Sequence, residues 1–318
     1  MSATISLEDM QGFLSKSLSS MNNNKLNGVL AEVSLRDHIE RLGFGDRISP
    51  GGWIARCDSR GDKDFAAETV VMFPEKLFIN QDYSRTNGFP SPPLGLHTIC
   101  STFHQIGIKS YYCVAKSATH ESDDVLQWYS MQLGLPRAGD YELFPDSIEG
   151  FATRQRRYNY LRYKTDATVI PVDHTPSEYA KESLRVAFSN KYFSEVSDLD
   201  AVFWGERHTY PVEIKEKTAA TKSGVGEYFG LDIGPFVKLA YYAAKRGNLH
   251  SLFVVREIDD RESRNLVDWW YVTFETLAQF ASWNFIGGGT NMGGGASATV
   301  PIPKSAFTPL NRNTLAAL

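Results

Sequence analysis

Residues Asp200 to Lys217 read DAVFWGERHTYPVEIKEK, and this stretch decides the expected fold. A short apolar run at 201–204 follows Asp200 directly. A polar turn at 205–208 separates it from a second β-rich run at 210–214. Two such runs joined by a short polar turn predict a β-hairpin.

The second run of the hairpin carries charged residues at every other position. Residues two apart on a strand share a face of the sheet. Glu213, Lys215 and Lys217 are therefore expected on one face. Val212 and Ile214 are expected on the opposite face, where they can pack in a core. The alternative is a solvated hairpin whose charges only keep one face of a sheet wet.

Two carboxylates and an amine in this arrangement suit the hydrolysis of a phosphodiester bond. A divalent metal held by oxygen atoms can activate water and relieve charge on the phosphoryl group. Asp200 and Glu213 are the expected carboxylate ligands, and the carbonyl of Ile214 is the expected backbone ligand. Mg²⁺ is the expected metal, because it prefers oxygen ligands and keeps several waters, and Mn²⁺ is expected to substitute. Lys215 is expected to stabilise phosphoryl charge or to orient the attacking water.

The stretch resembles the PD-(D/E)xK nuclease superfamily, the fold of many restriction endonucleases and Holliday-junction resolvases. The likeness rests on Asp200 opening one strand, on Glu213-x-Lys215 ending the next, and on helices before and after. It covers the region from about residue 176 to residue 274. The resemblance implies a restriction-endonuclease-like core with Asp200, Glu213 and Lys215 as the metal-binding and catalytic residues. Leu199 stands where the motif has proline.

Several further residues are candidates for the same site. Asp198 is a rival for the first carboxylate. Some members of the superfamily add an acidic residue from the preceding helix, and Glu182 is the expected accessory residue, with Glu32 on an earlier helix as an alternative. Lys217 is a possible accessory cation. Lys238 either faces the site or is a surface lysine.

A basic and aromatic segment lies between residues 154 and 164. Its five cations alternate with three tyrosines, a mixture that suits contacts with nucleic-acid phosphates and stacking on bases or sugars. The alternative is a half-buried element whose tyrosines pack in the core. The expected nucleic-acid-binding residues are Arg154, Arg156, Arg157, Arg162 and Lys164.

The order of elements from residue 176 onward is helix, strand, strand, helix, strand, strand, helix. This order predicts an α/β fold with a central mixed β-sheet flanked by helices. Residues 1–24 are expected to form a loosely held arm with at most one short helix. Residues 25–150 are expected to form an N-terminal α/β region for recognition or dimerisation, and residues 151–318 the catalytic region. A helix is also expected at 124–133, and a capping box at the start of the helix that follows Thr175.

Composition limits the class of protein. The chain has 318 residues, of which 42% are hydrophobic and 22% charged, as in ordinary globular proteins. The formal net charge of −4 provides no bulk attraction to nucleic acid, so such binding must come from local clusters. The three cysteines form no CxxC pair. No apolar run reaches the length of a membrane span, so no membrane partner and a cytoplasmic location are expected.

These observations together predict a Mg²⁺-dependent endonuclease acting on double-stranded DNA, with a type II restriction endonuclease as the expected subtype. Cleavage of both strands with one site per subunit implies a homodimer. A repair, recombination or phage-related nuclease is the alternative within this class. The alternative of another class is a non-catalytic nucleic-acid-binding protein that retains the fold. His208, in the hairpin turn, is either a general base or an exposed turn residue.

Overall fold

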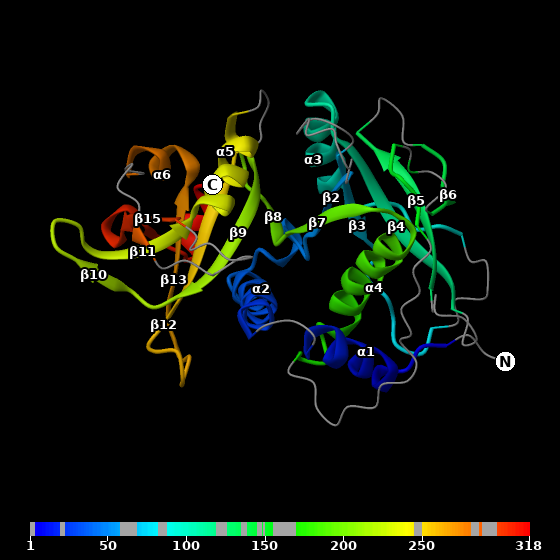
Figure 1. Ribbon diagram of the computed structural model, residues 1–318, viewed down its shortest axis with the longest axis horizontal. Helices are drawn as coiled ribbons and strands as arrows, with labels where there is room; N and C mark the ends of the chain where they lie inside the picture. Colours follow the sequence, from blue (N-terminus) through cyan, green and yellow to red (C-terminus); the bar gives the residue numbers. More distant parts are fainter. Residues whose placement is uncertain are drawn as a thin grey trace. The chain divides into compact units, whose positions relative to one another are not determined.

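The structure is a computed structural model. The chain forms two compact units (Figure 1). Unit 1 comprises Met1–Leu26 and Pro50–Leu199, and unit 2 comprises Asn27–Ser49 and Asp200–Leu318. The residues that the structure describes are 4–19, 23–57, 69–81, 88–118, 126–134, 139–144, 148, 150–154, 170–244, 250–280, 286–287 and 298–318.

The chain passes between the two units after Leu26, after Ser49 and after Leu199. Most of unit 1 is inserted into the sequence of unit 2, between Ser49 and Asp200. The compositional change near residue 150 therefore lies inside unit 1. An insertion of this kind leaves no compositional mark, because both segments of unit 2 have ordinary globular composition.

Unit 1 is built on a mixed six-stranded sheet in the order β6-β5-β4-β3-β2-β7. Strands β3 and β4 are parallel and are connected by α3, whereas the other neighbours are antiparallel. The strands are β2 (Gly52–Cys57), β3 (Thr69–Pro74), β4 (Lys109–Ala118), β5 (Leu126–Leu133), β6 (Glu142–Leu143) and β7 (Ser194–Leu199). The helices are α1 (Leu7–Ser19), α3 (Leu94–Gln105) and α4 (Thr175–Lys191).

The described part of residues 1–24 contains helix α1, as the sequence allows for this arm, and that helix is packed in the core. Residues 7–19 form helix α1, and its neighbourhood contributes Ile5, Met10 and Leu14 to the buried core. The ring of Phe13 meets that of Tyr179 on α4 edge-on, with 5.1 Å between centroids. Apolar burial therefore fixes the arm, although the polar residues around it suggested a loose segment.

Two local predictions in unit 1 are wrong. The segment expected as a helix at 124–133 forms strand β5 over its described residues, where Leu126, Trp128 and Ser130 alternate as buried positions against β4. The segment becomes a strand, in which apolar side chains alternate every two residues, because pairing with β4 fixes its backbone hydrogen bonds. Helix α4 begins at Thr175 itself, and the Thr175 hydroxyl donates to the carbonyl of Pro171, so the expected capping box is absent.

Unit 2 contains two sheets. The larger is mixed, in the order β1-β8-β9-β12-β13-β16, and the smaller is antiparallel, in the order β10-β11-β15-β14. The strands are β1 (Ile48–Ser49), β8 (Ala201–Trp204), β9 (Thr209–Lys217), β10 (Ala220–Lys222), β11 (Gly226–Asp232), β12 (Leu252–Ile258), β13 (Leu266–Thr273), β14 (Ile286–Gly287), β15 (Ala298–Pro303) and β16 (Thr308–Pro309). The helices are α2 (Asn23–Arg41), α5 (Ile233–Ala244), α6 (Phe274–Phe280) and α7 (Arg312–Ala316), with 3₁₀ turns at Gly45–Arg47 and Lys304–Ala306.

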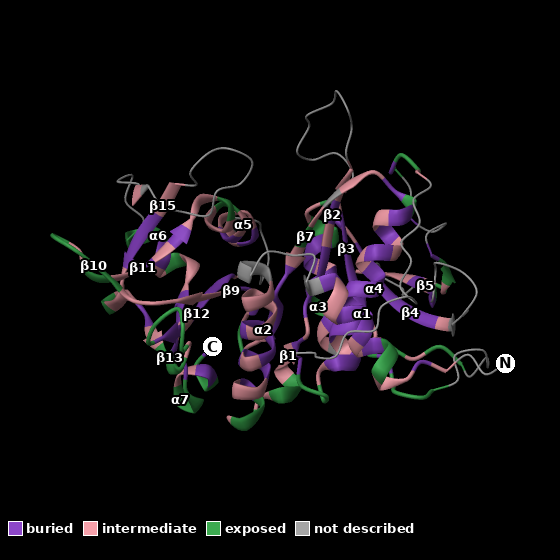
Figure 2. Ribbon diagram, turned by 60° about the horizontal axis from the view of Figure 1, so that its bottom comes forward, coloured by how far each residue is buried: buried purple, intermediate pink, exposed green. Residues whose placement is uncertain are grey.

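The large sheet of unit 2 buries both of its faces, and Figure 2 shows buried residues along its central strands. One face packs against α2 and α7, with Val212, Ile214 and Val254 in that core. The other face packs against α5, α6 and the smaller sheet, with Phe253 and Val255 in that core. Both units are thus α/β, with mixed sheets flanked by helices, as the sequence predicts.

Among the described helices, none is both long and apolar enough to cross a bilayer.

Candidate functional site

The expected hairpin is present in unit 2. Strands β8 and β9 are antiparallel, and the last pair at one end of their ladder is Ala201 with Val212. The next step of this register sets Asp200 opposite Glu213. Asp200 directly precedes β8, so the register brings the two residues to the same end of the hairpin.

Asp200 is buried, with 3% of its surface exposed, and its carboxylate is tied to β9. Oδ2 of Asp200 accepts the backbone N–H of Ile214 at 2.7 Å. Because β8 begins only at Ala201, this carboxylate takes the place of a backbone acceptor. The N–H and C=O of one strand residue point to the same edge, so the Ile214 carbonyl also points to the edge on which Asp200 lies.

Glu213 is 2% exposed and meets two ammonium groups. Nζ of Lys215 lies 2.7 Å from Oε1 of Glu213, and Nζ of Lys238 contacts Oε2. Lys238 comes from α5, which follows β10 and β11 in the crossover from β9 to the parallel strand β12. Of the two interpretations of Lys238, the structure agrees with the one in which it faces the site.

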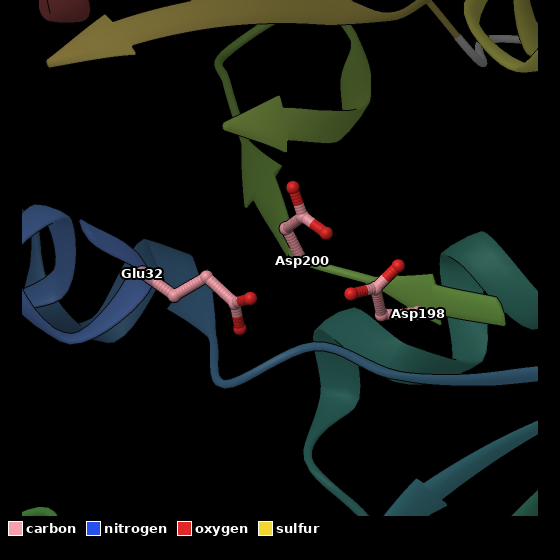
Figure 3. Close-up of side chains that lie close together, drawn as sticks. All are labelled: Glu32, Asp198 and Asp200. Carbon is pink, nitrogen blue, oxygen red and sulfur yellow. The ribbon is translucent and has the colours of Figure 1, made fainter. Parts of the chain in front are cut away.

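A further carboxylate of unit 2 lies beside Asp200. Glu32, on α2, is 4% exposed, and one of its carboxylate oxygens lies within 4.8 Å of one of Asp200 (Figure 3). Helix α2 is held against the sheet by its neighbours Ala31 and Leu35. Figure 3 also labels Asp198, which precedes Asp200 by two residues at the end of β7 in unit 1.

Glu182, the expected accessory acid, belongs to unit 1. It is 5% exposed, accepts two hydrogen bonds from the guanidinium of Arg185 and one from the hydroxyl of Ser17 on α1. It is buried, with an ion pair to Arg185 on the same helix and a hydrogen bond from Ser17 of α1. Glu32, rather than Glu182, is the helix carboxylate in the unit that holds Asp200 and Glu213.

Lys217 shares the face of Lys215, one strand step further on. Burial lowers the pKa of its amine, and the neighbouring charges of Lys215 and Arg261 lower it too, while Asp232 raises it. Asp232 in turn accepts a hydrogen bond from the hydroxyl of Thr299 at 2.9 Å. Lys217 therefore has a carboxylate neighbour of its own, distinct from Glu213.

An ion-pair cluster around Glu216 lies on the other face of β9, near its C-terminal end. Glu216 accepts hydrogen bonds from Arg256 at 2.7 Å and from Arg264 at 2.8 and 3.0 Å. Arg264 has a positive φ of 51°, so the loop after β12 holds an uncommon backbone conformation where its guanidinium meets Glu216. The cluster fixes the end of β9 beyond Glu213 and Lys215.

His208, in the hairpin turn, is neither fully exposed nor placed beside Asp200 in the register of the hairpin. Its ring lies over that of His250, with 3.8 Å between centroids, and Nδ1 of His250 lies 2.7 Å from a carboxylate oxygen of Glu275. Burial lowers the pKa of His208, as does the charge of His250, while Glu275 raises it.

Of the basic segment, the structure describes only Arg154. Its Nε donates to the carbonyl of Ser189, and its guanidinium lies 5.4 Å from the ring centre of Phe193. These contacts tie Arg154 to the C-terminal end of α4. The expected binding residues Arg156, Arg157, Arg162 and Lys164 lie outside the described residues.

The candidate donors of unit 2 are hard oxygens. The carboxylate of Glu32, from α2, lies beside that of Asp200, whereas Glu213 contacts Lys238 of α5, on the opposite face of the sheet, and the carbonyl of Ile214 belongs to β9. Such donors suit Mg²⁺ or Mn²⁺ and not the softer metals that prefer sulfur or imidazole. Comparisons with protein-family models, with curated proteins and with solved structures found no match for this chain.

Proposed function

We propose that this protein is a Mg²⁺-dependent endonuclease that hydrolyses phosphodiester bonds of double-stranded DNA. The observation that carries the proposal is the register of the β8–β9 hairpin, whose next step sets the buried Asp200 opposite the buried Glu213, with Lys215 in contact with Glu213. The connection of β9 to the parallel strand β12 through α5 supports a restriction-endonuclease-like core.

The chemistry of the donor set supports a resident divalent cation. Asp200, Glu213 and the Ile214 carbonyl are the proposed ligands, and Glu32 would hold the ion directly or through a water. Mg²⁺ commonly takes few protein ligands and keeps several waters, so these oxygens are sufficient. When bound, the ion supplies charge relief for the phosphoryl oxygens and a more acidic water.

The remaining chemistry belongs to residues of the chain. The side chain of Lys215 is 36% exposed, whereas that of Glu213 is 3% exposed, so the ammonium can meet a phosphate that reaches the carboxylate from solvent. There it would stabilise the charge that develops on the phosphoryl oxygens or orient the attacking water. The hydrogen bond from Ile214 fixes the direction of the Asp200 carboxylate before substrate arrives.

A type II restriction endonuclease is the proposed subtype. Unit 1, which is inserted before the strand that follows Asp200, is the proposed source of target recognition or of dimer contacts. A homodimer would apply one site to each strand of a two-fold symmetric target. A repair, recombination or phage-related nuclease would use the same site on a different DNA structure.

The test is cleavage of plasmid and linear double-stranded DNA with Mg²⁺, with Mn²⁺ and with EDTA. We expect metal-dependent cutting that falls by about a thousandfold or more in Asp200→Asn and in Lys215→Ala. Asp268→Asn and Lys222→Ala are matched controls, because both residues are exposed and lie in unit 2. Cutting that persists in Asp200→Asn or Lys215→Ala would overturn the site.

The form of the products separates the remaining alternatives. Discrete fragments indicate sequence-specific cleavage, whereas a smear indicates a general nuclease. Binding of DNA without cutting under any of these conditions would favour the non-catalytic alternative and refute the proposed activity.

A further inference from the structure

The buried carboxylate of Glu213 is in contact with two ammonium groups. Lys215 and Lys238 reach its two oxygens separately, Oε1 and Oε2. Each of the two oxygens of Glu213 is therefore already in contact with an ammonium group.

The two lysines come from different elements. Lys215 is on β9, two residues after Glu213, and its side chain is 36% exposed. Lys238 is on α5, and its side chain is 20% exposed. Leu239, the next residue of α5, is 1% exposed in the core and anchors the helix there. A lysine side chain has a flexible four-carbon stem, so its ammonium can leave Oε2 while α5 stays in place.

The oxygen that Lys238 contacts is one that a divalent cation would need. A cation bound between Glu213 and Asp200 would be coordinated by a Glu213 oxygen and would be repelled by any ammonium group that lies nearby. We propose that Lys238 competes with the divalent cation for Glu213, so that it weakens metal binding and is displaced from Oε2 when the metal binds. This inference rests on the proposed function in one respect, since it takes Glu213 as a metal ligand.

Competition has a consequence that a purely structural ion pair lacks. If Lys238 only stabilises the fold, removing its charge lowers stability and leaves the affinity for metal unchanged or reduced. If Lys238 competes with the metal, removing its charge lowers stability without Mg²⁺ but tightens Mg²⁺ binding. The metal then restores more stability to the variant than to the wild-type protein, because ligand binding stabilises the folded state by mass action.

The experiment is Mg²⁺ titration of the full-length protein by calorimetry in the absence of DNA, together with thermal unfolding with and without Mg²⁺. We expect Lys238→Met to bind Mg²⁺ about tenfold more tightly than wild type. The repulsion between the ammonium group and the ion, which the variant lacks, weakens the affinity by about that factor. Lys238→Gln is a second neutral variant, in case the methionine variant does not fold. Lys238→Arg retains the charge and is expected to stay within about threefold of wild type.

Two controls identify the origin of the effect. Lys222→Met, which removes an exposed lysine of the same unit, should leave Mg²⁺ binding unchanged. In a Glu213→Gln background, Lys238→Met should no longer tighten binding. Unchanged or weaker Mg²⁺ binding in both neutral variants would overturn the inference, as would tightening that persists in the Glu213→Gln background. Tighter Mg²⁺ binding in a protein that cuts no DNA would support the inference and refute the proposed nuclease activity.

Discussion

The variant Asp200→Asn separates the stability of the site from its activity. In unit 2 the carboxylates of Asp200 and Glu32 are both buried, with oxygens within 4.8 Å of each other. Two unit negative charges at that distance repel by about 3 kcal/mol when the effective dielectric constant is about 20. Asparagine has nearly the same shape and keeps an oxygen that can accept the N–H of Ile214.

The expected gain in stability is smaller than the full repulsion. A neutral acceptor makes a weaker hydrogen bond than a carboxylate, by about 1 kcal/mol, so the net increase in unfolding free energy without metal is about 1–2 kcal/mol. For a domain of this size, that increase raises the unfolding midpoint by about 2–8 °C. Calorimetric scans in EDTA measure the midpoint, and Asp268→Asn is the control.

The same variant should respond differently to Mg²⁺. Wild type should gain stability from Mg²⁺, whereas Asp200→Asn should gain much less and should cut DNA at least about a thousandfold more slowly. A lower unfolding midpoint for Asp200→Asn in EDTA would refute the reasoning. It would mean that the Asp200 carboxylate stabilises the folded protein without a metal. Its repulsion with Glu32 would then not be a cost that a bound cation relieves.

Three further predictions concern the surroundings of the site. Glu216→Gln should lower the unfolding free energy by about 2–4 kcal/mol, because it removes the carboxylate that two arginines share, and urea unfolding measures the loss. The pKa of His208 lies below its ordinary value of 6.5, so the folded state binds this proton less readily than the unfolded state. Stability should therefore fall as the pH decreases below about 6.5, and His208→Asn should reduce that slope between pH 5 and pH 7; an unchanged slope would contradict the assignment. Gly205→Ala should destabilise by about 1–3 kcal/mol, because its Cβ would lie 2.3 Å from the carbonyl oxygen of Leu318, whereas Gly28→Ala in α2 meets no atom within 4 Å and should stabilise by up to about 1 kcal/mol.

The hairpin at Asp200–Lys217 could be predicted because its signals are local. The alternation around Glu213 and Lys215, and the polar turn at 205–208, together determine the two strands and their faces. The buried positions Val212 and Ile214 then follow from the same alternation. Short-range patterns are enough wherever the pairing partner is the next segment of the chain.

The differences between prediction and structure have two causes. The segment at 126–133 follows β4 directly in the order of strands, and the alternation of Leu126, Trp128 and Ser130 becomes a strand by pairing with that neighbour. The residues around Phe13 pack against helix α4, more than 150 residues further along the chain. This second partner cannot be identified from the local sequence, because the contact joins segments far apart in the chain.

The site shows the same limit. Glu182 is the expected accessory acid because the resemblance implies one from the helix before the strand of Asp200, yet the insertion of unit 1 makes the helix just before β7 part of another unit. Glu32 belongs to the helix that precedes β1, the strand that pairs with β8. The contact of Lys238 with Glu213 could have been predicted from its place on α5, because this helix belongs to the crossover between the neighbouring parallel strands β9 and β12.

The insertion of unit 1 also bears on how the chain reaches its folded state. The pair Ser49 and Val202 of β1 and β8 closes a loop of about 150 residues, for which the entropic cost is about 4 kcal/mol if the loop is unstructured. In unit 1, the antiparallel pair Gly52 and Leu199 of β2 and β7 holds the two ends of that loop together. If unit 1 folds first, most of this cost is already met when the β1–β8 pair forms. Folding of unit 1 then lowers the entropic cost of pairing β1 with β8, the strand that begins directly after Asp200.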